Sequence, residues 1–317
     1  MKFFSTCKRA LPGLCLLLAG HFASAHEAVY ADPKIEGRWD VTIMENGQVK
    51  PSWLEVYHSG HKRLVGSYVG ISGSARPVSL IEFHDNKLHF SLPPQWEQED
   101  NDLIIDAVLQ ADTLLGTLRA ADGKTYPWSA HRAPSLVRAK QPVWGAPIKL
   151  FNGKDLSGWK ALGENQWVVE PGGILHSPKS GANLITERKF EDFKLHIEFR
   201  CPSGSNSGIY LRGRYEVQIE DSYGKSPQKD YMGAIYGFLT PSEMAAKPAG
   251  EWQTYDITLV GRQVTIVANG KEIICKQTIP GITGGALDSD EGAPGPIYIQ
   301  GDHGPIEYRN IILTPAK

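Results

Sequence analysis

The sequence predicts an all-β protein. Short runs of alternating apolar and polar residues, separated by Gly, Pro, Asn and Asp, follow one another from residue 35 to the end of the chain. Almost no segment has the period of a helix, and no internal repeat is present. The length of 317 residues corresponds to about two domains of ~150 residues each. We therefore expect two β domains in tandem.

The first 25 residues have the pattern of a secretory signal peptide. Lys2, Lys8 and Arg9 precede an apolar run over residues 14–19, and a small-x-small sequence ends at Ala25. The apolar run is too short to span a bilayer, so a membrane span is not expected. We expect cleavage near Ala25 and export to the periplasm or the medium.

Cleavage at that point would leave two cysteines, Cys201 and Cys275. In an oxidising compartment they can pair, but two separate buried thiols fit the sequence equally well. The residues before Cys15 are not those of a lipoprotein signal, so no lipid anchor is expected.

The charge balance argues against a nucleic-acid partner. The chain has 33 Lys and Arg against 35 Asp and Glu, a formal net charge of -2, and it contains no basic run. The sequence does not set the oligomeric state.

Residues 35–132 contain eight short strand-like runs and predict a small antiparallel barrel or compact sandwich. Hairpins are expected at residues 85–86 and 111–112. Trp39 opens the first run and Arg132 closes the last, an arrangement that resembles lipocalin-like barrels. Residues 133–147 contain three prolines and no period, and are expected to form a linker.

Residues 148–317 predict a larger jelly-roll-like β-sandwich, in which Asn269-Gly270 marks a hairpin. The alternation assigns these residues to its core: Leu195, Ile197, Phe199, Val217, Ile219, Ile257, Leu259, Val264 and Ile266.

Three runs of this half carry a polar face opposite an apolar one. "SNSGIYLRGRYEVQIED", over residues 205–221, is interpreted as a single strand, and "KLHIEFR" and "PIYIQGDHG" alternate in the same way. A solvated outer face is the simpler explanation. The abundance of Arg, Glu, Gln, Tyr and His, which bond through planar or bidentate groups, favours a surface that binds sugar hydroxyls.

Several segments of this half resemble one family when they are taken in order. "LFNGKDLSGWK", "NSGIYLRGRYEVQIED", "GAIYG", "KPAGEWQTYDI", "VANGKEI" and "QGDHGPIEYRNI" together resemble the 3-keto-disaccharide hydrolase domain family over about residues 148–315. The resemblance implies a concanavalin-like sandwich that acts on glycosides oxidised to a ketone at C3. Such a ketone acidifies the C2 hydrogen, so a base can remove that hydrogen and expel the C1 substituent, after which water can add.

Candidate catalytic residues follow from the polar face and the motifs. Glu216 is the first candidate for a base or a metal ligand, with an ion pair to Arg212 as its structural alternative. Arg212 could polarise the ketone or neutralise Glu216 or Glu198. His303 lies in a Gly-flanked loop, where an accessible imidazole could act as a base, bind metal or serve only the structure.

Six further residues are candidates for substrate binding: Glu198, Asn206, Gln218, Tyr236, Trp252 and Gln300. No cofactor is assigned with certainty, and a divalent metal stays open with these candidate ligands: Glu198, Glu216, Asp221, Asp302 and His303. The leading hypothesis is an exported enzyme that cleaves, or eliminates across, the glycosidic bond of 3-keto-glycosides. The alternative is a non-catalytic, lectin-like carbohydrate-binding protein.

Overall fold

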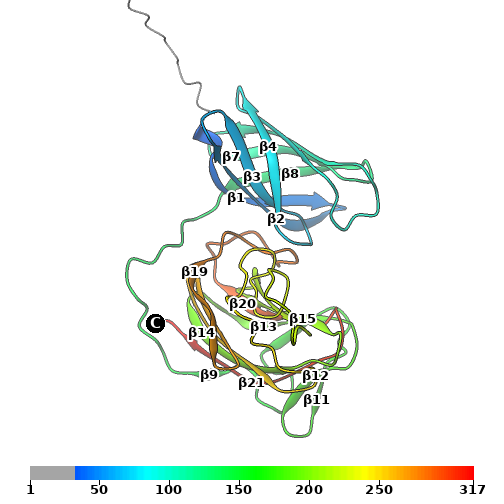
Figure 1. Cartoon of the computed structure of the whole chain (residues 1–317), viewed down its shortest axis with the longest axis vertical. Coiled ribbons are helices and arrows are strands. Elements are labelled where there is room, and N and C mark those ends of the chain that lie inside the picture. The colour runs from blue at the N-terminus through cyan, green and yellow to red at the C-terminus, as the bar shows by residue number, and fades with distance from the viewer. Residues whose placement is uncertain (1–32) are drawn as a thin grey trace, which may run out of the picture.

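The computed structural model describes residues 33–317 (Figure 1). The predicted signal peptide, with Cys7 and Cys15, lies outside the described residues. Within the described part, the structure is built from strands and one short 3-10 helix, η1 (Pro33–Ile35), so the predicted all-β fold class is confirmed. Over the same residues no helix is long and apolar enough to cross a membrane.

The first body is a closed barrel in which each strand pairs with the next and β8 pairs back to β1. Its strands are β1 (Gly37–Glu45), β2 (Gln48–Ser59), β3 (Arg63–Val69), β4 (Arg76–His84), β5 (Lys87–Leu92), β6 (Leu103–Gln110), β7 (Thr113–Arg119) and β8 (Thr125–Arg132). Asp85, Asn86 and Ala111 have positive φ angles, as the two predicted hairpins require. The Arg132 guanidinium lies 3.8 Å from the ring centre of the buried Trp39. This contact connects β8, the last strand of the barrel, to β1, the first.

The second body is a sandwich of two sheets. The five-stranded sheet has the order β10 (Trp159–Leu162), β13 (Asn183–Phe190), β20 (Gly295–Ile299), β15 (Asn206–Leu211) and β16 (Tyr215–Glu220). The eight-stranded sheet has the order β11 (Val168–Glu170), β12 (Ile174–Ser177), β21 (Ile306–Pro315), β14 (Phe193–Arg200), β17 (Gln253–Val260), β18 (Gln263–Ala268) and β19 (Lys271–Thr278), with β9 (Ile148–Lys149) paired to β21.

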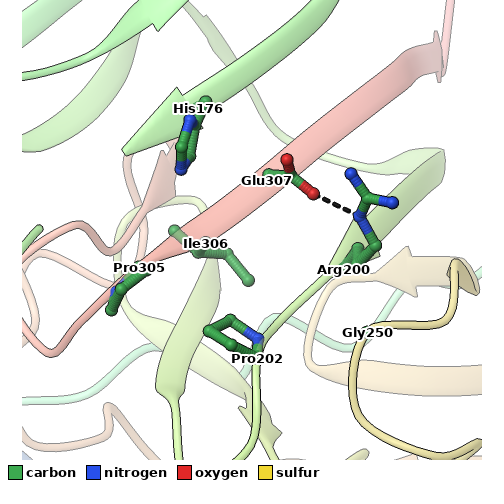
Figure 2. Close-up of a pocket in the computed structure, with 7 residues that line it drawn as sticks. All are labelled: His176, Arg200, Pro202, Gly250, Pro305, Ile306 and Glu307. Carbon is green, nitrogen blue, oxygen red and sulfur yellow. Dashed lines mark hydrogen bonds and ion pairs between the residues drawn. The ribbon is translucent and has the colours of Figure 1, made fainter. Parts of the chain in front are cut away.

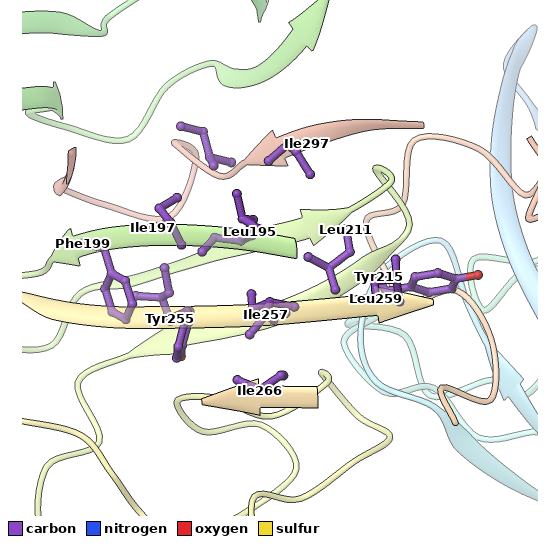
Figure 3. Close-up of a cluster of buried hydrophobic side chains, with 14 of the residues drawn as sticks. Leu195, Ile197, Phe199, Leu211, Tyr215, Tyr255, Ile257, Leu259, Ile266 and Ile297 are labelled. Carbon is purple, nitrogen blue, oxygen red and sulfur yellow. The ribbon is translucent and has the colours of Figure 1, made fainter. Parts of the chain in front are cut away.

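The core of the sandwich lies between these two sheets (Figure 3). Leu195, Ile197 and Phe199 of β14 point into it, and Ile297 of β20 comes from the opposite sheet. All nine core positions expected from the sequence are at most 1% exposed. Inward apolar side chains on both sheets leave the alternate positions of each strand on the two outer faces.

The expectation of one strand over residues 205–221 is wrong. The chain turns back at Arg212 and Gly213, whose φ angles are 54° and 68°, and the Arg214 N–H donates to the Leu211 carbonyl over 3.1 Å. This closes a tight hairpin between β15 and β16, with Leu211 opposite Tyr215. The apolar residues keep the same period on both sides of the turn, and Gly213, which stands at the apolar position between Leu211 and Tyr215, is the one break in the alternation.

The barrel and the sandwich are in contact through buried side chains. Trp53 of β2 is fully buried, belongs to the hydrophobic cluster of the sandwich, and meets Phe238 edge to face with ring centres 5.4 Å apart. Arg38 of β1 forms an ion pair with the buried Glu291 of the sandwich. An alanine side chain at Gly281 would overlap the indole of Trp53. The contact is therefore closely packed.

The segment between the two bodies is bonded to the last strand. The Gly145 N–H donates to the Pro315 carbonyl over 2.8 Å, and the Lys317 N–H donates to Val143 over 2.8 Å. Cys201 and Cys275 are both free; Cys201 is buried and Cys275 is exposed on β19. The two thiols are therefore separate, as the alternative to a disulfide expected, but only Cys201 of the two is buried.

Candidate functional site

A buried carboxyl group occupies the outer face of the five-stranded sheet. Glu216, on β16, is 4% exposed and accepts a hydrogen bond of 3.0 Å from the hydroxyl of Tyr210 on β15. The Gln300 side-chain amide donates to the same Tyr210 oxygen over 3.2 Å. Tyr210 and Glu216 are directly opposite in the hairpin register, which places both side chains on one face. We call these three residues the Glu216 cluster.

Gly208 makes room for this cluster. It faces Gln218 in the β15–β16 register, and a Cβ atom there would lie 2.9 Å from Glu216 Cγ and 2.9 Å from Gln300 Oε1. Ordinary contacts of this kind are about 3.5–4.0 Å long. The missing side chain of Gly208 therefore allows the Glu216 and Gln300 side chains to lie across β15.

Two loop segments hold the free edge of β16 in place. The Thr283 hydroxyl accepts a bond of 3.0 Å from the Glu216 N–H, and the Tyr236 N–H donates to the Glu216 carbonyl over 3.0 Å. Both backbone groups of Glu216 are thus satisfied by neighbouring loops. Tyr236, a predicted substrate-binding residue, is consequently placed beside Glu216.

Burial raises the pKa of Glu216 to about 8. The hydrogen bond from Tyr210 and the positive charge of His303 lower this pKa, and the negative charge of Asp302 raises it, but desolvation is the largest effect. A carboxylate with such a pKa is a stronger base than an exposed glutamate, and it changes protonation state near neutral pH.

A rim of polar groups connects the cluster to the exposed surface. The Tyr298 ring stacks on Tyr210 with centres 4.3 Å apart, and its hydroxyl accepts a bond of 2.9 Å from the Asn183 amide. Asn183 also donates to Asp302 over 3.0 Å, and Asp302 is 2.6 Å from Nδ1 of His303. Glu216 is thus linked by neighbouring side chains to an exposed carboxylate–imidazole pair.

The Asp302–His303 pair favours an imidazolium. The hydrogen bond to Asp302 raises the pKa of His303, desolvation opposes that rise, and the negative charges of Asp302 and Glu216 add to it. Burial raises the pKa of Asp302, but hydrogen bonds from His303 and Asn183 outweigh burial, and the net pKa is lowered. The pair therefore carries an ionised carboxylate next to an imidazole that readily holds a proton.

Three other residues predicted from the sequence lie on or next to the five-stranded sheet, and two of them are held by hydrogen bonds outside the Glu216 cluster. Gln218 shares the outer face with Glu216, but its amide donates to the Asp230 carbonyl over 3.2 Å and its oxygen accepts from the Ile219 N–H. Asn206 is half-buried at the start of β15. Asp221 lies beyond the end of β16 and accepts bonds of 3.1 Å from Ser203 and from the Gly204 N–H. Gln218 and Asp221 therefore have structural partners of their own.

Glu198 and Trp252 lie away from the Glu216 cluster. Glu198 is on β14 of the eight-stranded sheet, where it bonds Arg309 over 2.6 Å, and the Arg309 guanidinium lies 3.9 Å from the Trp252 ring centre. Because Ile197 points into the core, Glu198 points out of the opposite side of the sandwich. The polar face of β14 is therefore not part of the surface that carries Glu216, because strand pairing assigns β14 to the other sheet.

Arg212 also does not meet Glu216. It is fully buried, and its guanidinium donates to the Tyr215 hydroxyl and the Gly261 carbonyl, each over 3.0 Å. The turn at this residue breaks the i, i+4 relation that would have placed it beside Glu216. Neither the predicted ion pair with Glu216 nor a contact with a ketone fits this position.

The candidate metal ligands are not gathered into one group. Within residues 33–317, the carboxylate and imidazole atoms that lie within 4.8 Å of one another in a group of three belong to Glu170, His176 and Glu307. His176 and Glu307 line a hollow of about 310 Å³. Figure 2 shows both side chains, with Glu307 paired to Arg200. None of the five residues expected from the sequence belongs to this group.

Sequence reasoning missed the residues that orient Glu216. Tyr210 and Tyr298 were recognised only as members of a polar face, and Asn183 was not considered because β13 carries no motif. The φ angle of Gly208 is not unusual, so its role depends on what lies beside it. The alternation of residues 205–221 could have pointed to Tyr210, since it shares the face of Glu216.

The family model described as "3-keto-alpha-glucoside-1,2-lyase-like domain" matches residues 146–314. The chain belongs to this family. It is 24% identical over 166 residues to a Bacteroides thetaiotaomicron protein named 3-keto-disaccharide hydrolase, a match over 40% of this chain and 57% of that protein. The chain thus spans little more than half the length of this curated relative.

Solved structures with a similar arrangement include a putative glycosyl hydrolase from Parabacteroides distasonis. It is 30% identical, with a TM-score of 0.46 over 58% of this chain and 96% of that one. A Bacillus licheniformis beta-glucanase is 11% identical, with a TM-score of 0.34 over 57% of this chain and all of that one.

Proposed function

We propose that this protein is an exported, carbohydrate-active enzyme that breaks the glycosidic bond of 3-keto-glycosides, with Glu216 as the base. One observation carries the proposal: a carboxyl group that is 4% exposed, with a pKa near 8, is held by Tyr210 next to an imidazole–carboxylate pair. Membership of the 3-keto-alpha-glucoside-1,2-lyase-like family and the name of the curated relative support the substrate class.

In the proposed reaction, the Glu216 carboxylate takes the hydrogen from C2, which the C3 ketone has acidified. The electron pair of the C2–H bond forms the C1–C2 double bond, and the bond from C1 to the leaving oxygen breaks. Water can then add across the unsaturated sugar, which gives overall hydrolysis. A base with a raised pKa suits the first step, because proton abstraction from carbon improves with base strength.

His303 is proposed to protonate the leaving oxygen. It is exposed, its pKa is raised by Asp302, and it interacts electrostatically with Glu216. A group that holds a proton beside a base that has lost one is the pairing that elimination requires. The sequence left open a base, a metal ligand or a structural role for His303, so the acid role proposed here is a different one, based on the proton that Asp302 favours on the imidazole.

Gln300 and Tyr236 are proposed to bind the sugar. Gln300 is 6% exposed, and its Oε1 atom is buried without a hydrogen-bond partner among the described residues. A buried unpaired carbonyl oxygen costs free energy until a donor arrives, and a sugar hydroxyl would supply one. Tyr236 is half-buried next to Glu216 and offers a ring face for the sugar.

The test measures release of a chromogenic aglycone from a 3-keto-glucoside and from its unoxidised parent, with and without chelator. Release from the keto sugar alone is expected. Glu216→Gln should lower it by about 10²–10⁴-fold. Glu220→Gln, on the same strand but paired with Lys225, should leave it unchanged. Product analysis for the unsaturated sugar separates elimination from hydrolysis. Tight binding of the keto sugar without turnover by wild type would contradict the enzyme and favour a lectin-like role.

A further inference from the structure

A loop of the barrel lies against the segment that contacts the Glu216 cluster. The loop between β3 and β4, residues 70–75, accepts a hydrogen bond of 3.0 Å at the Ile71 carbonyl from the N–H of Gly285. A Cβ atom on Gly284 would lie 2.7 Å from the Gly73 nitrogen and 2.8 Å from the Ser72 carbonyl carbon. Backbone therefore packs directly on backbone at this point of the domain contact.

The same barrel loop also approaches Tyr236. A Cβ atom on Gly237, the next residue, would lie 2.7 Å from Ser74 Cβ and 2.8 Å from the Ala75 nitrogen. Tyr236 and Thr283 are the two residues whose groups bond the backbone of Glu216. Both loops that position Glu216 are thus in contact with residues 70–75 of the barrel.

Gly284 has a direct chemical link to the cluster. Its carbonyl oxygen lies 2.9 Å from the Tyr210 hydroxyl, and that hydroxyl also lies 3.0 Å from Glu216. A hydroxyl has one proton, so Tyr210 can donate to only one of these acceptors at a time. When Glu216 is ionised, the Tyr210 hydroxyl donates its proton to the Glu216 carboxylate. When Glu216 is protonated, the Gly284 carbonyl is the acceptor that keeps the buried hydroxyl satisfied.

We propose that the barrel contributes to the catalytic site. Gly73 and Gly284 are positioning residues, and what they position is the hydroxyl of Tyr210. The β3–β4 loop fixes the Gly284 carbonyl, and this carbonyl holds the Tyr210 hydroxyl while Glu216 carries the proton taken from substrate. The inference rests on the proposed role of Glu216. It gives the barrel a function in the site, since the barrel loop holds the Gly284 carbonyl in place. Separating Gly284 from Gly73 should raise the free energy of the protein with Glu216 protonated. The free energy of the form with Glu216 ionised should hardly change.

Other groups that face Glu216 set the background for this effect. The groups that interact with Glu216 from the elements packed against it are Tyr210 of β15, Tyr298 of β20, Tyr308 of β21, Thr283 of the loop between β19 and β20, Tyr236 of the loop after β16, and Gln300, Asp302 and His303 after β20. Gly284→Ala replaces none of these side chains, but Tyr210 is bonded to Gly284 and Thr283 adjoins it. A change in Glu216 after that substitution therefore reports the displaced segment at residues 283–285, whose Gly284 carbonyl is the acceptor of the Tyr210 hydroxyl.

The test is Gly284→Ala in the full chain, with Gly292→Ala as its control. A Cβ at Gly292 meets its nearest neighbour at 3.6 Å, an ordinary contact, whereas one at Gly284 must push the two backbones apart. Protonation of Glu216 is followed by infrared difference spectroscopy of the ligand-free protein, with Glu216→Gln in each background to identify the band. We expect the proton to bind about tenfold more weakly in Gly284→Ala, because a buried hydroxyl loses its acceptor.

Activity provides a second readout. With the keto sugar, Gly284→Ala should lower kcat by about tenfold or more with little change in KM, and Gly292→Ala should behave as wild type. The infrared titration needs no turnover, so it decides the inference even if the proposed substrate is wrong. An unchanged titration of Glu216 in a folded Gly284→Ala protein would overturn it.

If Gly284→Ala does not fold cooperatively, Trp96→Ala takes its place. Trp96 is 66% exposed, and its indole lies over Gly73, so its removal loosens the barrel loop without introducing a clash. A smaller shift of Glu216 in the same direction is expected. Titration identical to wild type would again contradict the role of the barrel.

Discussion

Substitution of Gly208 by alanine is the sharpest test of the Glu216 cluster, because it adds one methyl group at a defined point. The new Cβ would lie 2.9 Å from Glu216 Cγ and 2.9 Å from Gln300 Oε1, and closer still to Glu216 Oε1. Gly208 lies in β15 without a positive φ angle, so alanine introduces no backbone strain. The only expected cost is displacement of the two side chains.

The magnitude follows from these distances. Restoring a contact of about 3.5–4.0 Å moves the Glu216 carboxyl by about 1 Å, because the flanking strand cannot move away from a paired register. Misplacement of a reacting group by about 1 Å can lower a rate by about 10²-fold. That factor corresponds to about 2.7 kcal/mol in the activation barrier.

The assay compares initial rates of aglycone release from a 3-keto-glucoside for wild type, Gly208→Ala and Gly292→Ala. We expect kcat to fall about 10²-fold in Gly208→Ala, with cooperative unfolding retained, and no change in Gly292→Ala. If Gly208→Ala keeps the wild-type kcat at every pH, the carboxyl of Glu216 is not the base, and the assignment built on its position is refuted.

Three further outcomes are expected. The kcat/KM for the keto sugar should follow a bell-shaped pH profile, because Glu216, whose pKa is about 8, must be ionised while His303 must keep its proton. Glu216→Gln should abolish this profile together with the activity, and a flat profile in wild type would contradict the two assignments. Trp53→Ala should lower the free energy of unfolding by about 3–5 kcal/mol in urea titrations, since it deletes a fully buried indole that meets Phe238, whereas a loss under 1 kcal/mol would show that the domain contact is loose. Burial and the neighbouring Glu291 raise the pKa of Asp40 to about 8, so between about pH 4 and 8 the folded protein keeps a proton that the unfolded chain has lost. The free energy of unfolding should therefore fall as pH rises through this range. Asp40→Asn should flatten this dependence in urea titrations, and an unchanged slope would exclude the Asp40–Glu291 pair as its source.

Strand content, core residues and the hairpins at residues 85–86, 111–112 and 269–270 were predictable from the sequence, whereas the hairpin at Arg212 and Gly213 was not. The side-chain period of two is a local property, and Asp85-Asn86 and Asn269-Gly270 supply the positive φ angles of tight turns without help from distant residues. Glu216 was also predictable, because its alternation with apolar neighbours placed a carboxyl on the outer face of a strand.

The assembly of the cluster was not predictable from local pattern. Arg212 adopts a positive φ angle although the apolar period is the same before and after it, and Gly213 is the only residue that marks the turn that removes Arg212 from Glu216. Glu198 and Glu216 have the same kind of pattern, but hydrogen bonding between strands places them in different sheets and on opposite faces.

The sequence by itself determined which side chains face inward or outward on each strand, because that choice is made between adjacent residues. Only the tertiary structure decided which outward groups meet. Tyr210 reaches Glu216 across a hairpin, Asn183 reaches Asp302 across 119 residues, and Gly284 reaches Gly73 between two bodies. Such pairings depend on the register and packing of distant strands, and the free energy of burying them is shared over the whole fold rather than held in any short stretch of the chain.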